Sequence, residues 1–159
     1  MIDFRGRPTR DEDLDWILRL ETAEREAGWI KGSTRDQHRA WFGDPNIAHV
    51  VFEQDGDAVG YAILRGLLSP DRDIELKRVV VETKGKGHGR AAIRWCRHFA
   101  FAEHGAHRLW LDTYEHNVRA QGLYESEGFV REGLLREAAR TDSGYVSLVI
   151  YSLLASDAG

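Results

Sequence analysis

The stretch from Val79 to Arg90 has the composition of a site that binds an anion. Three consecutive valines, which are typical of the end of a buried strand, precede glycines at positions 85, 87 and 89, and a segment with helical character follows. Glycine permits backbone with positive φ, and the first N–H groups of a helix lack partners within it. The spacing therefore predicts a phosphate-binding turn. Positive charge is added around it by Lys84, Lys86 and Arg90.

Two widespread phosphate-binding loops do not fit this stretch. A Walker A loop has Ser or Thr after its Gly-Lys pair, to hold Mg²⁺, but Gly87 follows Gly85-Lys86 here. A Rossmann fingerprint has the spacing Gly-x-Gly-x-x-Gly at the first strand of the fold, whereas this third glycine comes one residue early and lies in the middle of the chain. A nucleotide-binding P-loop protein is therefore kept only as an outside alternative.

Other reactive side chains do not form a recognisable constellation. His104 and His107 supply two ligands near a helix end, whereas a zinc site needs three or four, so no metal is predicted. Cys96 falls on the apolar face of the helix that follows the glycines, without a partner to activate it. Because it is the single cysteine, no internal disulfide can form, which fits a reducing compartment.

The elements that position the glycine stretch can be placed from periodicity and capping signals. Capping boxes at Thr9 to Glu12 and at Thr34 to Gln37 predict a helix to about Ala27, ended by Gly28, and a short helix through Phe42. Strands are predicted over 48–53, 59–64, 74–81, 107–113, 129–136 and 145–153, and helices over about 90–103 and 118–127. This order predicts one α/β domain over 1–159, with a right-handed βαβ unit around the glycines.

The glycine stretch, preceded by a hydrophobic strand, resembles the acetyl-coenzyme A loop of the GNAT acetyltransferases. Lys84 stands where that family has Gln or Arg. Asn117, Leu123-Tyr124-Glu125 and Gly128-Phe129 are similar to the family's second signature, and the stretch from Gly128 to Leu153 is similar to members that acetylate protein N-termini, polyamines and other small amines. The resemblance covers roughly 74–153. It implies a mixed, mostly antiparallel sheet of six or seven strands, flanked by about four helices, with a splayed parallel strand pair holding the cofactor.

The resemblance implies acetyl-CoA as the acyl donor. Glycine-loop N–H groups would hold the pyrophosphate, and the main chain of the valine strand would pair with the pantetheine arm. Asn117 would approach the arm, although a helix cap alone is the plain alternative. The residues assigned to cofactor binding are Val79, Val80, Val81, Lys84, Gly85, Lys86, Gly87, His88, Gly89, Arg90 and Asn117.

The resemblance also implies two catalytic residues for direct attack by an amine on the thioester. Tyr124 would donate a proton to the leaving thiolate, since a phenol is neutral at pH 7. Glu75 lies six residues before Val81, the position of the base in histone-acetylating members. The alternatives are a strand carboxylate paired with Lys77 or Arg78, and a water chain as the base.

The acceptor would be a small-molecule amine or a protein N-terminal amine. The resemblance places it against the first helices and the last hairpin, so that 1–73 contributes to the acceptor site and 74–153 forms the cofactor-binding core. Charged and aromatic residues in those segments are Glu21, Glu24, Glu26, Trp29, Trp41, Glu137, Arg140 and Asp142. A competing reading is a non-catalytic acyl-CoA-binding module or sensor, and a different acyl donor or amine is a further alternative.

The composition limits which partners and which cellular compartment can be expected for this protein. With 22 basic and 26 acidic residues, the net charge of −4 gives no electrostatic footprint for nucleic acid. No apolar run approaches the ~20 residues of a membrane span, and no signal peptide is recognisable. We expect a cytoplasmic protein without membrane or nucleic-acid partners. A homodimer is left open.

Overall fold

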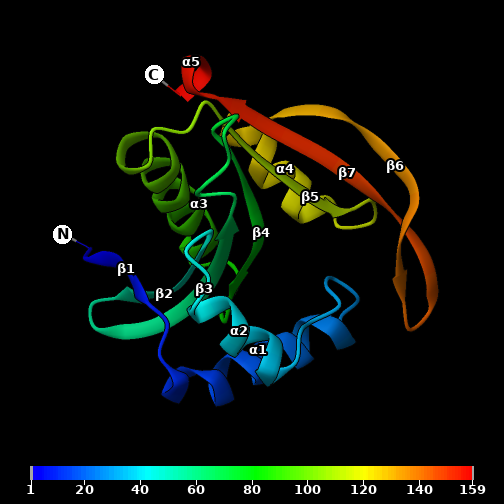
Figure 1. Cartoon of the computed structure of the whole chain (residues 1–159). Helices are drawn as coiled ribbons and strands as arrows, with labels where there is room; N and C mark the ends of the chain where they lie inside the picture. Colours follow the sequence, from blue (N-terminus) through cyan, green and yellow to red (C-terminus); the bar gives the residue numbers. More distant parts are fainter. Residues whose placement is uncertain (1, 159) are drawn as a thin grey trace.

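The computed structural model describes residues 2–158 and contains a seven-stranded sheet in the order β1-β2-β3-β4-β5-β7-β6 (Figure 1). The strands are β1 (Phe4–Pro8), β2 (Ile47–Gln54), β3 (Asp57–Arg65), β4 (Asp73–Val81), β5 (Arg108–Tyr114), β6 (Val130–Thr141) and β7 (Gly144–Leu154). The α-helices are α1 (Leu14–Glu26), α2 (Arg35–Phe42), α3 (His88–His98), α4 (Val118–Ser126) and α5 (Ala155–Ala158). Neighbouring strands are antiparallel except for β4 and β5, which are parallel. The predicted fold class is confirmed.

The helices cover both faces of the sheet, because the strands alternate their apolar side chains (Figure 1). On β3, Tyr61 and Ile63 pack against α1, whereas Ala62 and Leu64 belong to the larger core beneath α3 and α4. No helix within residues 2–158 is long and apolar enough to cross a membrane.

The parallel pair at the centre of the sheet separates after a short contact. β4 and β5 pair only at Asp73 with Arg108, Ile74 with Leu109, and Glu75 with Trp110. A bulge lies just beyond, since β3 pairs Leu64 with Leu76 but Ile63 with Arg78, which leaves Lys77 as the extra residue on β4. A bulge bends its strand and increases the local twist. Within the described residues, the remainder of β4, up to Val81, therefore has no strand partner on the side of β5.

The N-terminal segment differs from the sequence-based prediction. β1 was not predicted, because a five-residue edge strand with Gly6 and Pro8 has no apolar alternation, and its pairing with β2 defines it. The first capping box was wrong by one residue: the N–H of Arg10 donates to the Asp13 carboxylate at 2.7 Å, and the Thr9 hydroxyl contacts His49 instead. The helix begins as one 3₁₀ turn over Asp11–Asp13 before α1.

Most other boundaries agree with the prediction within a few residues. Thr34 caps α2 by accepting the N–H of Gln37 at 3.2 Å, and Gly28 follows α1 with a φ of 86°. The helix predicted over 90–103 begins at His88 and finishes as a π-helical turn over Phe99–Glu103. The hairpin of β6 and β7 is longer than predicted and extends to Thr141 (Figure 1).

Candidate functional site

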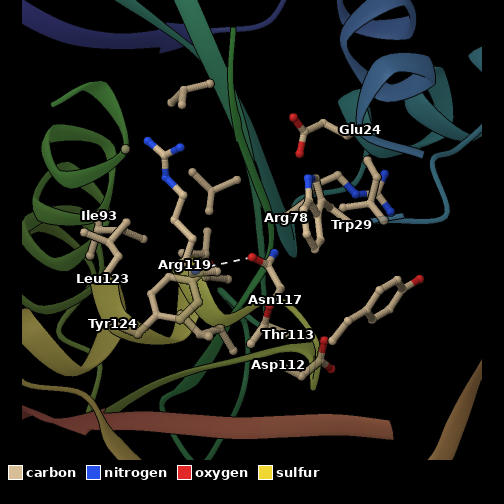
Figure 2. Close-up of a pocket in the computed structure, with 18 of the residues that line it drawn as sticks. Glu24, Trp29, Arg78, Ile93, Asp112, Thr113, Asn117, Arg119, Leu123 and Tyr124 are labelled. Carbon is tan, nitrogen blue, oxygen red and sulfur yellow. Dashed lines mark hydrogen bonds between the residues drawn. The ribbon is translucent and has the colours of Figure 1, made fainter. Parts of the chain in front are cut away.

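A cavity of about 810 Å³ opens where β4 and β5 separate (Figure 2). One end is lined by the glycine loop and α3, and its walls come from β4, β5 and α4. The segment after α1 and the hairpin of β6 and β7 also contribute side chains. Elements that are remote in sequence therefore meet around a single space.

The free edge of β4 supplies main-chain groups to this cavity. The N–H of Glu82 donates to Val59 on β3 at 2.9 Å, so the alternation of an antiparallel pair turns the peptide groups of Val81 and Val79 away from β3. The side chains of Val79 and Val81 line the cavity, whereas that of Val80 is buried against the α1 face. Buried main-chain groups of this kind need a hydrogen-bonding partner.

The glycine loop has the backbone geometry that its composition predicts. Gly85 and Gly87 have φ values of 82° and 80°, a region that L-residues with a side chain rarely adopt. No atom lies within 4 Å of a Cβ built at either position, so the loop faces open space. Gly87 caps α3, whose first N–H groups have no partner in the helix. These amides form the concave, positively polarised end of the cavity.

The side chains of the loop mostly bind protein groups. The Lys84 ammonium donates to Glu24 at 2.8 Å and to the carbonyl of Val81 at 3.1 Å. Arg90 lines the cavity but donates to Glu127 at 2.6 Å. Lys86 is exposed outside the cavity lining, and His88 is buried with no hydrogen bond to Nδ1 from any residue of 2–158. Lys84 and Arg90 are therefore committed to protein carboxylates.

Arg119 is a cavity residue that the sequence-based analysis missed. Its side chain extends from α4 along the wall that also holds Leu123 and Ile93 (Figure 2), and it makes no hydrogen bond or ion pair with the described residues. Its position two residues after the capping Asn117, and four before Leu123, places it on the helix face that lines the cavity. Arg119 thus provides an uncompensated cation on the wall opposite β4.

Asn117 and Tyr124 lie on the same helix. Asn117 caps α4 by accepting the N–H of Ala120 at 3.2 Å, and it also lines the cavity (Figure 2). Tyr124 is buried between Phe129 and Tyr151, and its hydroxyl has no hydrogen-bonding partner among residues 2–158. Burial raises the pKa of this phenol, so it is protonated throughout the neutral range.

Two carboxylates line the cavity near the point where the parallel strands separate. Glu75 accepts a hydrogen bond from Arg65, and not from Lys77 or Arg78, which the sequence suggested as partners. Asp112 on β5 was not predicted; within residues 2–158 its carboxylate has no hydrogen bond or ion pair. Burial, and next the charge of Glu75, raise the pKa of Asp112 against the opposing effect of Lys77.

The segments expected to bind the acceptor contribute unequal numbers of side chains to the cavity lining. Glu24 and Trp29 line the cavity (Figure 2). Tyr114, which was not predicted from the sequence, also lines it. Glu21 is instead buried behind the wall, and Trp41 packs against His38. From the last hairpin the lining residues are Ala138, Ala139 and Leu148 rather than Glu137, Arg140 and Asp142. The register of the hairpin shifts between Leu135 and Ala139, and Glu137 has a φ of 46°. Strand alternation in the sequence therefore could not predict which side chains face the cavity.

The separated parallel strand pair and the glycine-capped helix at its open end are the arrangement that the resemblance to the acetyltransferases implied. The sequence model of the acetyltransferase (GNAT) family matches residues 14–129, and the chain belongs to this family. It is an acetyl-CoA-dependent N-acetyltransferase. No group of three or more His, Cys, Asp or Glu residues within 2–158 is arranged to hold a metal ion.

Individual relatives agree with this assignment. A candidate ribosomal protein bS18-alanine N-acetyltransferase of Bacillus subtilis is 26% identical over 151 residues, which are 91% of this chain and 92% of that protein. An uncharacterised N-acetyltransferase of Mycobacterium bovis is 36% identical over 106 residues, 65% of this chain and 67% of that protein. The crystal structure of a spermidine N-acetyltransferase from Vibrio cholerae in complex with CoA and spermine is 22% identical, covers 98% of this chain and 97% of that chain, and has a TM-score of 0.86. At that identity it shows a shared fold.

Proposed function

We propose that this enzyme transfers the acetyl group from acetyl-CoA directly to a primary amine, without an acyl-enzyme. The observation that carries the proposal is the continuity of the cavity, which is lined both by the glycine loop and by Trp29, Asp112 and Tyr114. Donor and acceptor can therefore be held together, which lowers the entropic cost of reaction between two molecules. Acetyl-CoA supplies the activated acyl group as a thioester.

The donor half of the cavity has the groups that the cofactor requires. The amides of Gly85, Gly87 and Gly89 would hold the pyrophosphate, with Arg119 as the free cation beside them. The open edge of β4, from Val79 to Val81, would pair with the amides of the pantetheine arm. A main-chain N–H near Val80 would stabilise the oxyanion as the amine adds to the carbonyl carbon.

Tyr124 is proposed as the general acid. Its hydroxyl lacks a protein partner although the residue is only 8% exposed, and it lies in the wall of the cavity. A protonated phenol there can donate to the thiolate that leaves the tetrahedral intermediate. The raised pKa keeps the proton available.

The acceptor arrives as an ammonium and must lose a proton before the neutral amine can attack; that proton goes to a carboxylate at the closed end of the strand pair, directly or through water. Glu75 is the candidate from the sequence, and Arg65 holds its carboxylate in place. Asp112 is the second candidate and is without a protein partner in the described chain. A general base works best when its pKa approaches the working pH, and the direction of the Asp112 shift favours it.

The experiment is a transfer assay with purified protein, acetyl-CoA and a panel of primary amines. Release of free CoA thiol, together with mass spectrometry of the acceptor, measures acetyl transfer. We expect turnover that depends on the amine. Thermal stabilisation by CoA without turnover on any amine would instead indicate an acyl-CoA-binding module, and stabilisation by ATP–Mg²⁺ but not by CoA would indicate a nucleotide-binding protein.

A further inference from the structure

Arg78 is a partly buried arginine that uses only part of its hydrogen-bonding capacity. It follows the bulge on β4, its side chain is 10% exposed, and it lines the cavity (Figure 2). Its Nη1 donates to Glu21 Oε2 at 2.8 Å and to Ser33 Oγ at 2.9 Å. Nε and Nη2 donate to no residue in 2–158. The free edge of the guanidinium is the Nε–Nη2 edge. Its two donors can bind the two oxygens of a carboxylate, or both can bind one carbonyl oxygen.

Glu21 holds Arg78 in this position. Oε1 of Glu21 accepts from His38 Nε2 at 2.9 Å and from the N–H of Ser33 at 3.1 Å. Oε2 accepts from the Tyr61 hydroxyl and from Arg78. Burial alone would raise the pKa of Glu21, but the hydrogen bonds from His38 and Tyr61 and the charge of Arg78 lower it. Because both oxygens are used, Glu21 is a fixed counter-ion for Arg78 and has no capacity left for the acceptor.

The remaining charges around the cavity do not suit a polycation. Glu75 is paired with Arg65, and Glu24 is paired with Lys84. Within residues 2–158, the lining cations without an ion pair are Lys31, Lys77 and Arg119, whereas the single lining carboxylate without one is Asp112. One carboxylate can receive one ammonium. A polyamine would bring further ammonium groups towards Lys31 and Lys77, which is unfavourable, whereas Arg119 lies in the donor half of the cavity.

We propose that Arg78 is a specificity-determining residue that binds, through Nε and Nη2, an oxygen adjacent to the acceptor amine. The acceptor is then an α-amino group beside a carbonyl or carboxylate, and a polyamine is a poor substrate. This inference rests on the proposed N-acetyltransfer. The oxygen has two possible sources, the carboxylate of a free amino acid and the first carbonyl of a peptide, and both present an acceptor atom at the same distance from the amine.

The test compares acceptors that share an amine but differ in the neighbouring oxygen. The panel contains alanine, alanine amide, a short peptide with N-terminal alanine, ethylamine and spermidine. We expect kcat/KM for at least one of the alanine compounds to exceed that for ethylamine and spermidine by about 10²-fold. A preference for alanine identifies the carboxylate as the ligand, and a preference for the amide and the peptide identifies the carbonyl.

Arg78→Lys keeps the positive charge beside Glu21 but removes the paired Nε and Nη2 donors of the guanidinium. We expect this variant to raise KM for the preferred alanine compound by about ten-fold or more, and to lower ethylamine turnover by a clearly smaller factor. A purely structural role would lower both activities equally. Arg39→Lys, at an exposed arginine paired with Asp11, is the matched control and should leave the ratio of the two activities unchanged.

A preference for ethylamine or spermidine, or an unchanged ratio in Arg78→Lys, would overturn the inference. A separate binding measurement distinguishes this failure from failure of the proposed function. With CoA present, N-acetylalanine should stabilise the wild-type chain against heat and should not stabilise Arg78→Lys. Absence of turnover with every amine would refute the proposed function, whereas equal stabilisation of both chains would refute the role of Arg78.

Discussion

Burial raises the pKa of both Tyr124 and Asp112, with opposite chemical consequences. For the phenol, a raised pKa keeps the neutral form, which is the form that donates a proton. For the carboxyl group, a raised pKa increases the basicity of the ionised form and brings its titration closer to neutrality. Burial therefore strengthens Asp112 as a base, whereas it keeps the Tyr124 proton in place and makes the phenol a weaker acid.

Replacing Tyr124 by Phe should lower kcat about 10²-fold and leave KM for acetyl-CoA nearly unchanged, because the proton donor is lost while the ring still fills the core. Steady-state kinetics with varied acetyl-CoA measure this. Tyr151→Phe is the matched control, since that phenol lies beside Tyr124 but donates to Glu125 at 2.9 Å and does not line the cavity. Equal losses in the two variants, or an unchanged kcat in Tyr124→Phe, would remove the general-acid role.

Asp112→Asn and Glu75→Gln should separate the two candidate bases. If Asp112 takes the proton, Asp112→Asn lowers kcat/KM about 10²-fold or more and abolishes the acid limb of its pH profile. Glu75→Gln should then retain that limb and shift it to lower pH, because removal of the Glu75 charge eliminates one cause of the raised pKa of Asp112. The opposite pattern would assign the proton transfer to Glu75.

Asp112→Asn also has a predicted effect on stability. The pKa of Asp112 is raised in the folded state, so its ionisation favours the unfolded state as pH rises through the unfolded and then the folded pKa. At pH 7 the variant should therefore melt at a higher temperature than the wild type, and below the unfolded pKa the difference should vanish. Differential scanning calorimetry at both pH values checks this. A lower melting temperature at pH 7 would mean that the carboxylate makes a stabilising contact.

At the scale of elements, the donor site depends on where β4 lies relative to β3. A Cβ added at Gly60 would be 2.5 Å from the Val80 carbonyl oxygen and 3.2 Å from the Val81 Cα. Both contacts are with main-chain atoms, so a side chain at this position can be accommodated only by moving the strand. Gly60 thus permits the close approach that sets the free edge of β4.

Gly60→Ala should destabilise the fold by about 1–3 kcal/mol and raise KM for acetyl-CoA, because the clash displaces the strand edge proposed to bind the pantetheine arm. Urea unfolding and initial-rate kinetics measure the two effects. Gly43→Ala is the matched control, since its φ is −92° and no atom lies within 4 Å of its Cβ position. If Gly60→Ala loses stability while KM stays at the wild-type value, the edge of β4 does not bind the donor.

At the scale of the whole molecule, the sequence predicted more of the cavity residues that are proposed to bind the donor than of those that are proposed to bind the acceptor. The valine strand, the glycines and the cap at Asn117 are contiguous or closely spaced, so local rules determine their geometry. The acceptor half joins Trp29, Arg78 and Asp112 from three elements that only the tertiary fold brings together. Glu21 illustrates the difficulty: its type suggested a ligand for an amine, but burial and four hydrogen bonds commit it to the interior.

The proposed donor site makes a prediction for the stability of the whole chain. CoA at about 100 times its Kd should stabilise the fold by about 2.7 kcal/mol, or roughly 5–10 °C in Tm for a domain of this size. ATP–Mg²⁺ should give no comparable shift, because Gly87 stands where a P-loop has its metal-binding hydroxyl.

Two glycine variants distinguish ligand binding from backbone strain in this measurement. Gly87 and Gly105 have φ values of 80° and 62°, and no atom lies within 4 Å of a Cβ at either. Alanine at each position should therefore lower the Tm of the free chain similarly, since both impose a left-handed conformation on an L-residue. Only Gly87→Ala should also reduce the shift produced by CoA, because it alters the amides that cap α3. An equal CoA-dependent shift in the two variants would place the pyrophosphate away from the loop.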